Sequence, residues 1–161
     1  HLAAEEGHEV VCATLLAAQG VDINAKNNNE WTALHFASQE GKAEVVRLLL
    51  EKGADASLRN NEGSTSLHLA AELNRHEVVY ATLLAAQGVD VNAKNNNEGT
   101  PLHLASQEGK AEVVRLLLEK GADVTLRNAE GQTPLDLTMN QDTRQTLRNF
   151  MCMAVYCASQ T

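Results

Sequence analysis

Residues 13–60 of this chain recur almost unchanged as residues 81–128, a displacement of 68 positions. The segment SQEGKAEVVRLLLEKGAD stands inside both stretches. We call residues 13–60 the first copy and residues 81–128 the second copy. A chain that repeats itself so closely is built from one structural unit used several times, and such a period restricts the fold more than composition does.

The dipeptide Leu-His reveals a finer period. His35, His68 and His103 each follow a leucine, with spacings of 33 (68−35) and 35 (103−68) residues. His1 and Asp136 extend the series by 34 (35−1) and 33 (136−103) residues. The basic repeat is therefore about 33 residues long, the length of a β-turn followed by two helices.

The second repeat shows how one unit is expected to fold. Thr32 is placed to cap a short helix that runs to about Gln39, and Gly41 supplies its left-handed stop. A second helix is predicted over residues 43–51, with an apolar face made of Val45, Val46, Leu48, Leu49 and Leu50. Helices this short are marginal alone, so each pair must pack against neighbouring pairs.

Several segments resemble the ankyrin repeat signature: GTPLHLA at residues 99–105, GQTPLDL at 131–137, and the degenerate TALH at 32–35 and TSLH at 65–68. The resemblance implies an all-α repeat solenoid of stacked helix-turn-helix units with β-hairpin-like fingers. It implies one domain over residues 1–161, with a first repeat that lacks its front. The expected repeats are 1–26, 27–60, 61–94, 95–127 and a C-terminal cap at 128–161.

Repeats one and three are longer than repeats two and four. Glu9 and Gly20 are 11 residues apart, as are Glu77 and Gly88, whereas Glu44 and Gly53 are 9 apart. We therefore expect a longer or bulged second helix in repeats one and three. The Asn-rich links 27–29 and 95–97 are predicted to be turns rather than disordered linkers, because Asn bonds its own backbone and tolerates the left-handed conformation.

Composition narrows the classes of function. The net charge of −8 disfavours a nucleic acid partner, and basic stripes with interleaved aromatic residues are missing. Cys12, Cys152 and Cys157 are odd in number and are not arranged as a disulfide framework, which predicts an intracellular, reducing and cytoplasmic setting. The sequence contains no stretch with the pattern of a signal peptide or membrane span, so no membrane association is expected.

The histidines and cysteines are interpreted as structural. His35, His68 and His103 lie one per repeat, too far apart to share a metal ion, and the resemblance makes them donors that tie neighbouring repeats together. Cys152 and Cys157 are interpreted as packing residues. Motifs of nucleophilic, phosphate-binding or zinc-dependent enzymes are missing, so we expect no catalytic residue, no metal site and no cofactor. Asn24 and Asn92 resemble the position modified by asparaginyl hydroxylases, or are turn-forming asparagines.

The resemblance implies a recognition surface on a concave groove lined by fingers and first helices. Specificity then lies at positions that the signature leaves free, and these are polar and acidic, which favours a protein or peptide with a basic surface. The predicted partner-binding residues are Asn28, Asn29, Trp31, Gln39, Glu40, Asn61, Glu62, Ser64, Glu72, Leu73, Asn96, Asn97, Gln107, Glu108, Glu130 and Gln132.

Trp31 is the only tryptophan, and its counterpart in the second copy is Gly99. Tryptophan is strongly enriched among binding hot spots, so we interpret Trp31 as a contact for the partner. The alternative is a local lid over the neighbouring finger. If Trp31 is a contact, its loss should weaken binding and barely change stability.

The apolar segment 150–157 admits three interpretations: an extension of the cap's second helix, which we favour, the start of another element, or a self-association surface. A monomer is expected, with an end-to-end dimer as the alternative. The predicted function is a non-catalytic protein interaction module within a larger protein. The alternative is the substrate-recruiting domain of an enzyme or ubiquitin-ligase adaptor.

Overall fold

The computed structural model describes residues 1–18, 20–72 and 77–158, without the side chains of residue 72 and residues 153–158. These residues form ten helices and no strand, which confirms the all-α repeat fold. The helices are α1 Leu2–Glu6, α2 Glu9–Ala17, α3 Ala33–Gln39, α4 Ala43–Glu51, α5 Ser66–Glu72, α6 Glu77–Ala85, α7 Pro101–Gln107, α8 Ala111–Glu119, α9 Pro134–Leu137 and α10 Gln141–Ala158.

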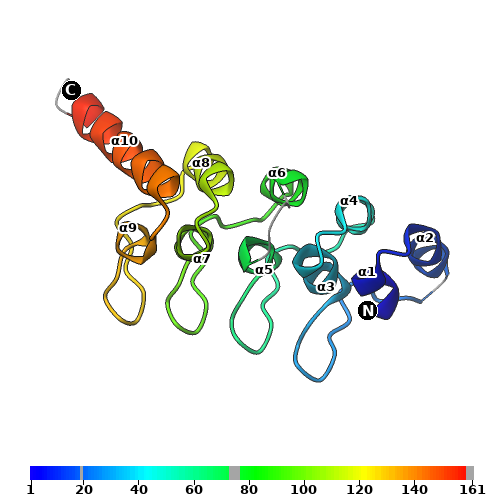
Figure 1. Cartoon of the computed structure of the whole chain (residues 1–161). Helices are drawn as coiled ribbons and strands as arrows, with labels where there is room; N and C mark the ends of the chain where they lie inside the picture. The colour runs from blue at the N-terminus through cyan, green and yellow to red at the C-terminus, as the bar shows by residue number, and fades with distance from the viewer. Residues whose placement is uncertain (19, 73–76, 159–161) are drawn as a thin grey trace. The chain divides into compact units, whose positions relative to one another are not determined.

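Two compact parts are distinguished, His1–Asp90 and Val91–Thr161. Within each part the helices alternate between two layers (Figure 1). In the first, α1 packs on α3 and α3 on α5, while α2 packs on α4 and α4 on α6. In the second, α7 packs on α9 and α8 on α10. We call α1, α3, α5, α7 and α9 the first helices and their partners the second helices.

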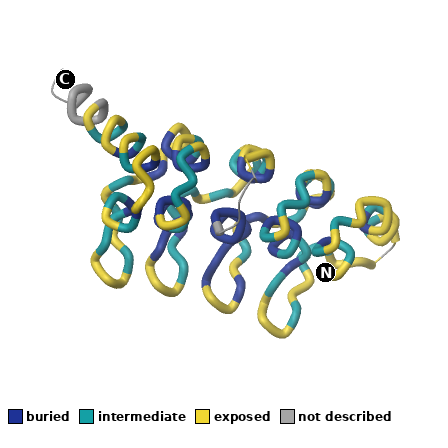
Figure 2. The backbone as a smooth tube through the Cα atoms, in the orientation of Figure 1, coloured by how far each residue is buried: buried dark blue, intermediate teal, exposed yellow. Residues whose placement is uncertain are grey.

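The loops that precede the first helices are closed by turns rather than by β-strands. We call residues 26–31, 59–64, 94–99 and 127–132 the fingers, and Figure 1 shows them projecting on the side of the first helices. Each finger tip is exposed, whereas burial is concentrated where helices face one another (Figure 2). The expected β-hairpin-like character is therefore limited to a hydrogen-bonded turn, such as the one that joins Asn27 N–H to the Trp31 carbonyl at 2.9 Å.

The predicted helix ends of the second repeat are confirmed. Thr32 caps α3: its hydroxyl accepts from His35 N–H, and His35 Nδ1 accepts from Thr32 N–H at 3.1 Å. Gly41 follows α3 with φ of 67°, the left-handed conformation that glycine adopts without a steric penalty. α4 then begins at Ala43 and ends at Glu51, as expected.

The prediction of longer second helices in repeats one and three is wrong. α2 and α6 have nine residues, as do α4 and α8. Relative to the shared glutamate, α2 begins at Glu9 whereas α4 begins one residue before Glu44. Two residues lie between Ala17 and Gly20, whereas one lies between Glu51 and Gly53. The two added positions therefore shift the helix by one residue and lengthen the following link by one.

The apolar face of α4 is narrower than its sequence predicts. Val45, Val46 and Leu49 are buried, whereas Leu48 and Leu50 are only partly covered. On a helix, residues 45, 46 and 49 point in one direction because they are spaced by three and four, and Leu48 and Leu50 lie on the flanks of that stripe. Leu49 is therefore the central core residue of this helix, rather than Leu48.

The first repeat exposes an apolar face that the third repeat buries. Leu2, Val11 and Leu15 are 70%, 48% and 51% exposed, whereas their counterparts Leu69, Val79 and Leu83 are 1%, 1% and 0% exposed. The third repeat packs through α5 on α3 and through α6 on α4, and these contacts cover the face. Identical side chains thus differ in burial because of the helix pair that lies against them.

The C-terminal cap contains one long helix. α10 has 18 residues, twice the length of the other second helices, and includes the backbone of the apolar segment as far as Ala158. This agrees with the favoured interpretation of an extended cap helix. The prediction that Cys152 is a packing residue is wrong, because its side chain is exposed on α10. The side chains of Met153, Val155, Tyr156 and Cys157 lie outside the described residues.

Candidate partner-binding surface

The fingers are shaped by asparagine side chains. Asn27 Oδ1 accepts from the backbone N–H of Asn29 and of Trp31, at 2.9 Å each. Asn95 Oδ1 does the same for Asn97 and Gly99, at 3.1 and 2.9 Å. The predicted turn chemistry of the Asn-rich links is confirmed. In each of these two links the first asparagine is half-buried and organises the turn, and the next two asparagines are exposed.

The left-handed position of each finger is the feature that the sequence interpretation missed. It falls on Glu30 and Glu98, with φ of 60° and 53°, rather than on an asparagine. The other two fingers have glycine there, Gly63 and Gly131. A non-glycine residue in this conformation costs about 1 kcal/mol or more. Alignment of the four fingers would have revealed the two glutamates.

Each of these glutamates is paired with a lysine of its own finger. Lys26 Nζ lies 3.2 Å from Glu30 Oε2, and Lys94 Nζ lies 3.1 Å from Glu98 Oε2. The side chains are exposed, so each pair contributes little to stability. Their effect is to place a fixed pair of opposite charges beside the finger tip in both copies.

Neighbouring repeats are tied together by the histidines of the signature, as predicted. His35 Nε2 lies 3.2 Å from the Leu58 carbonyl, and His103 Nε2 lies 3.1 Å from the Gln132 carbonyl. Because Nδ1 of each ring accepts from the capping threonine N–H, Nε2 carries the proton and donates to a carbonyl of the next repeat. Asp136 retains only the first of these functions: its Oδ2 accepts from Thr133 N–H at 2.9 Å.

Burial keeps these imidazoles neutral. Desolvation lowers the pKa of His35 to about 4, and hydrogen bonding to backbone groups offsets only part of that shift. The pKa of His103 is lowered for the same reason. Neutral imidazole is the form that accepts at Nδ1 and donates at Nε2, so the inter-repeat bond depends on it.

Most of the predicted partner-binding side chains are exposed on the fingers and first helices. We call this set the finger surface. Trp31, Gln39 and Gln132 are half-buried. The exposed members are Asn28, Asn29, Glu40, Asn61, Glu62, Asn96, Asn97, Gln107, Glu108 and Glu130. The Glu72 side chain and Leu73 lie outside the described residues.

Ser64 differs from this expectation. This residue is only 3% exposed, and its backbone closes the turn of the second finger through Asn60: Ser64 N–H donates to Asn60 Oδ1 at 2.9 Å, and its carbonyl accepts from Asn60 N–H at 3.0 Å. A side chain so covered has little surface to offer a partner. The small serine at this position is therefore used for finger closure.

Trp31 belongs to an aromatic cluster in the first compact part. Its ring centroid is 4.9 Å from that of Phe36 and 6.0 Å from that of His35, and the His1 ring meets Phe36 edge-on at 5.8 Å. Such aromatic pairs contribute about 0.5–1.5 kcal/mol beyond area burial. Trp31 therefore has a packing role in addition to its partly exposed surface, and its removal is expected to lower stability by this modest amount.

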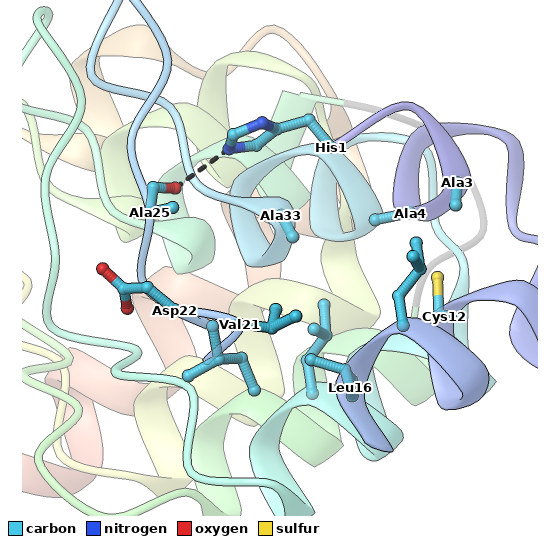
Figure 3. Close-up of a pocket in the computed structure, with 12 residues that line it drawn as sticks. His1, Ala3, Ala4, Cys12, Leu16, Val21, Asp22, Ala25 and Ala33 are labelled. Atoms are coloured by element: carbon cyan, nitrogen blue, oxygen red, sulfur yellow. Dashed lines mark hydrogen bonds between the residues drawn. The ribbon is translucent and has the colours of Figure 1, made fainter. Parts of the chain in front are cut away.

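Two cavities lie beside positions at which corresponding repeats have different residues. Cys12 stands where the third repeat has the fully buried Tyr80, and a cavity of about 230 Å³ opens beside Cys12, Ala4, Leu16 and Val21 (Figure 3). Burial raises the pKa of the Cys12 thiol, which disfavours the reactive thiolate. The second cavity, of about 290 Å³, lies beside Gly99, the counterpart of Trp31.

The described residues contain no group of three His, Cys, Asp or Glu side chains that could hold a metal ion. Within residues 1–18, 20–72 and 77–158, no helix has the length and apolar composition needed to cross a bilayer.

Asn24 and Asn92 connect successive repeats through their side chains. Asn24 Oδ1 accepts from Asp55 N–H at 2.9 Å, and Asn92 Oδ1 accepts from Asp123 N–H at 2.8 Å. Asn92 also donates to the Gly121 carbonyl at 3.3 Å. These bonds give both asparagines a structural role between repeats. Their hydroxylation stays a prediction that mass spectrometry of protein incubated with an asparaginyl hydroxylase tests, through the gain of one oxygen atom.

Comparisons with known proteins agree with this architecture. A family model described as ankyrin repeats (3 copies) matches residues 1–95, and one described as ankyrin repeats (many copies) matches residues 83–137. Over 40 residues the chain is 55% identical to "Ankyrin repeat and SOCS box protein 11" of Danio rerio. The matched stretch is 25% of this chain and spans 14% of the length of that relative.

Proposed function

Since the chain belongs to the ankyrin repeat family, we propose that it is a protein interaction module that binds a partner through its finger surface. Ankyrin repeats are protein-interaction modules. One observation carries the assignment to this surface. The signature residues Thr32, His35, Thr100 and His103 are buried in contacts that hold the repeats together, whereas the variable finger and first-helix positions are exposed.

The charge of the finger surface supports a partner with a basic face. Exposed carboxylates stand on the fingers and at the ends of first helices: Glu30, Glu40, Glu62, Glu98, Glu108 and Glu130. Each finger also carries one cation, Lys26, Arg59, Lys94 or Arg127, and Lys26 and Lys94 are paired with a glutamate of their own finger. The excess of acidic charge on this surface therefore comes from Glu40 and Glu108 at the ends of α3 and α7. Charge complementarity of this kind raises association rates and discriminates between partners more than it raises affinity.

The binding test begins with the chain as bait in an extract of cells that make it, followed by titration of each captured protein. We expect Trp31→Ala to weaken binding about 30-fold, corresponding to about 2 kcal/mol, because a half-buried tryptophan on the finger surface has the features of a hot spot. The cost to folding should be smaller, about 0.5–1.5 kcal/mol, through the lost contact with Phe36.

Val78→Ala is the matched control, because Val78 is an exposed apolar residue on the second helix α6. It should leave affinity within about twofold, since most interface truncations away from a hot spot are nearly neutral. If Trp31→Ala lowers the melting temperature and leaves affinity unchanged, Trp31 is a packing residue and the hot-spot assignment is wrong.

A second candidate is the substrate-recruiting domain of an enzyme or of a ubiquitin-ligase adaptor. It is favoured by the 55% identity to a protein whose name combines ankyrin repeats with a SOCS box. Both candidates use the same finger surface and differ in what is attached to it. Sequencing the complete transcript distinguishes them, because only the second candidate requires a catalytic or adaptor region in the same polypeptide. For either candidate we propose a monomer in the cytoplasm.

A further inference from the structure

The two copies differ at two neighbouring positions, one at the end of a finger and one on the first helix that follows it. Where the first copy has Trp31 and Phe36, the second copy has Gly99 and Leu104. In the first copy the indole lies against Phe36 and His35. The counterparts of those two residues, Leu104 and His103, line the cavity of about 290 Å³ together with Gly99. In the second copy a cavity therefore lies against the counterparts of the two residues that the Trp31 ring contacts in the first copy.

The lining of this cavity suits an aromatic side chain with a polar edge. Leu104 and Leu137, both half-buried, provide apolar surface. Asn97, Gln107 and Gln132 provide amide groups that can bond an indole N–H or a phenol O–H. The volume of about 290 Å³ is at the small end of the range of ligand pockets and leaves room for one inserted side chain.

One carboxylate lines the cavity, and others are adjacent in the chain to lining residues. Glu130 lines it and is exposed, and the exposed Glu108 follows the lining residue Gln107 directly in the chain. Glu98, next to Gly99, is already paired with Lys94. A segment that inserts an aromatic ring here would therefore gain from a neighbouring Lys or Arg, placed toward Glu108 and Glu130.

We propose that the cavity beside Gly99 is a subsite for a tryptophan or tyrosine side chain of a partner protein, flanked by a basic residue. The proposal rests on the proposed function, because it gives the finger surface of the second compact part its chemical preference. The first copy provides the precedent, since its own Trp31 ring lies against His35 and Phe36, the counterparts of the lining residues His103 and Leu104. The second copy takes the ring from the partner instead.

The test uses the full chain labelled with ¹⁵N and titrated with N-acetyltryptophanamide, N-acetyltyrosinamide and N-acetylleucinamide. We expect shift changes at the amides of Gly99, Leu104 and Gln132 that saturate in the millimolar range for the two aromatic probes, as is usual for ligands of this size. The leucine probe should bind about tenfold more weakly. Equal binding of all three probes, or shift changes distributed over the exposed apolar residues of α2, would overturn the proposal.

The double variant Gly99→Trp, Leu104→Phe installs the residues that the first copy already accommodates. It should abolish the shift changes at Gln132 by filling the cavity from within. Leu104→Phe alone serves if the double variant does not fold, and it should weaken the aromatic probes about tenfold. Persistence of full binding in the folded double variant contradicts the subsite.

The reciprocal variant Trp31→Gly, Phe36→Leu makes the first copy resemble the second. It should create a new set of shift changes around His35 with the aromatic probes, and the absence of that set would count against the proposal. Failure of the subsite is distinguishable from failure of the proposed function. If no probe binds, and a partner binds the wild type and the filled variant equally, the subsite is rejected and the interaction function is kept. Probe binding at Gly99 without any captured partner removes the interaction function alone.

Discussion

Replacing Leu83 with alanine should lower the free energy of unfolding by about 2–5 kcal/mol, whereas replacing Leu15 should cost about 1 kcal/mol or less. The two leucines are counterparts in segments of nearly identical sequence, but Leu83 is 0% and Leu15 51% exposed. Truncation of a buried leucine removes both its transfer free energy and its packing contacts. A leucine that is half exposed loses much less, because water and mobile neighbours already surround it.

Thermal unfolding measures this difference directly. For a domain of this size, 2–5 kcal/mol corresponds to a decrease of about 5–15 °C in the melting temperature. Stability in a stack of repeats is transmitted between neighbours, so hydrogen exchange in α6 should accelerate together with the global change. Equal destabilisation by the two substitutions would contradict the account. It would indicate that the apolar face of α2 is covered in solution, and sedimentation would then detect the end-to-end dimer.

Acid should destabilise the protein through its buried histidines. The unfolded-state pKa of a histidine is near 6.5 and the folded-state pKa of His35 is about 4. The unfolded chain therefore binds more protons between these values, and stability rises with pH across that window. The contribution of neutral His35 is complete above about pH 6.5 and is lost as pH falls through 4. His103 acts in the same direction.

Lowering the pH from 7 to 5 should cost about 2 kcal/mol through His35 alone. The carboxyls of Asp55 and Asp123 do not complicate this window, because side-chain hydrogen bonds from Ser57 and Thr125 lower their pKa below the ordinary 3.8. Urea unfolding of the wild type, His35→Gln and His8→Gln checks the prediction. His35→Gln should flatten the pH dependence, whereas His8→Gln at an exposed position serves as the control for replacing a histidine with glutamine. Identical slopes for all three proteins would refute the assignment.

The sequence predicted local structure better than burial. The bounds of α3 and α4 followed from Thr32, Gly41 and Gly53, because caps and glycine stops act within a few residues of themselves. The burial of Leu15 and Leu83 could not be predicted in this way. Their local sequences are almost the same, and only the covering helix pair distinguishes them. Leu48 was misjudged because periodicity identifies a face and not what lies against it. Ser64 and Cys152 were misjudged because their local sequence does not show which elements cover a residue.

For the candidate surface too, local features were predicted from the sequence, whereas contacts between elements were not. The exposed asparagines and glutamates of the fingers were predicted from the positions that the signature leaves free. The left-handed conformation of Glu30 and Glu98 was missed, because glutamate is not a residue type that predicts it. Only the alignment with Gly63 and Gly131 in the other two fingers indicates it. The contact between Trp31 and Phe36, and the cavity that replaces it in the second copy, needed coordinates, since both depend on side-chain direction between elements.

The central claim is that partners bind the finger surface and not the second helices. Two charge-reversal variants with the same change in net charge test it most directly: Glu40→Lys, Glu108→Lys at the ends of the first helices, and Glu44→Lys, Glu112→Lys on the second helices. All four glutamates are exposed.

The measurement is the dissociation constant of a captured partner at low and at physiological salt. The account predicts a loss of about tenfold or more for the first variant, larger at low salt and mainly in the association rate, and a change within about twofold for the second. Equal losses, or a loss confined to the second variant, would contradict it.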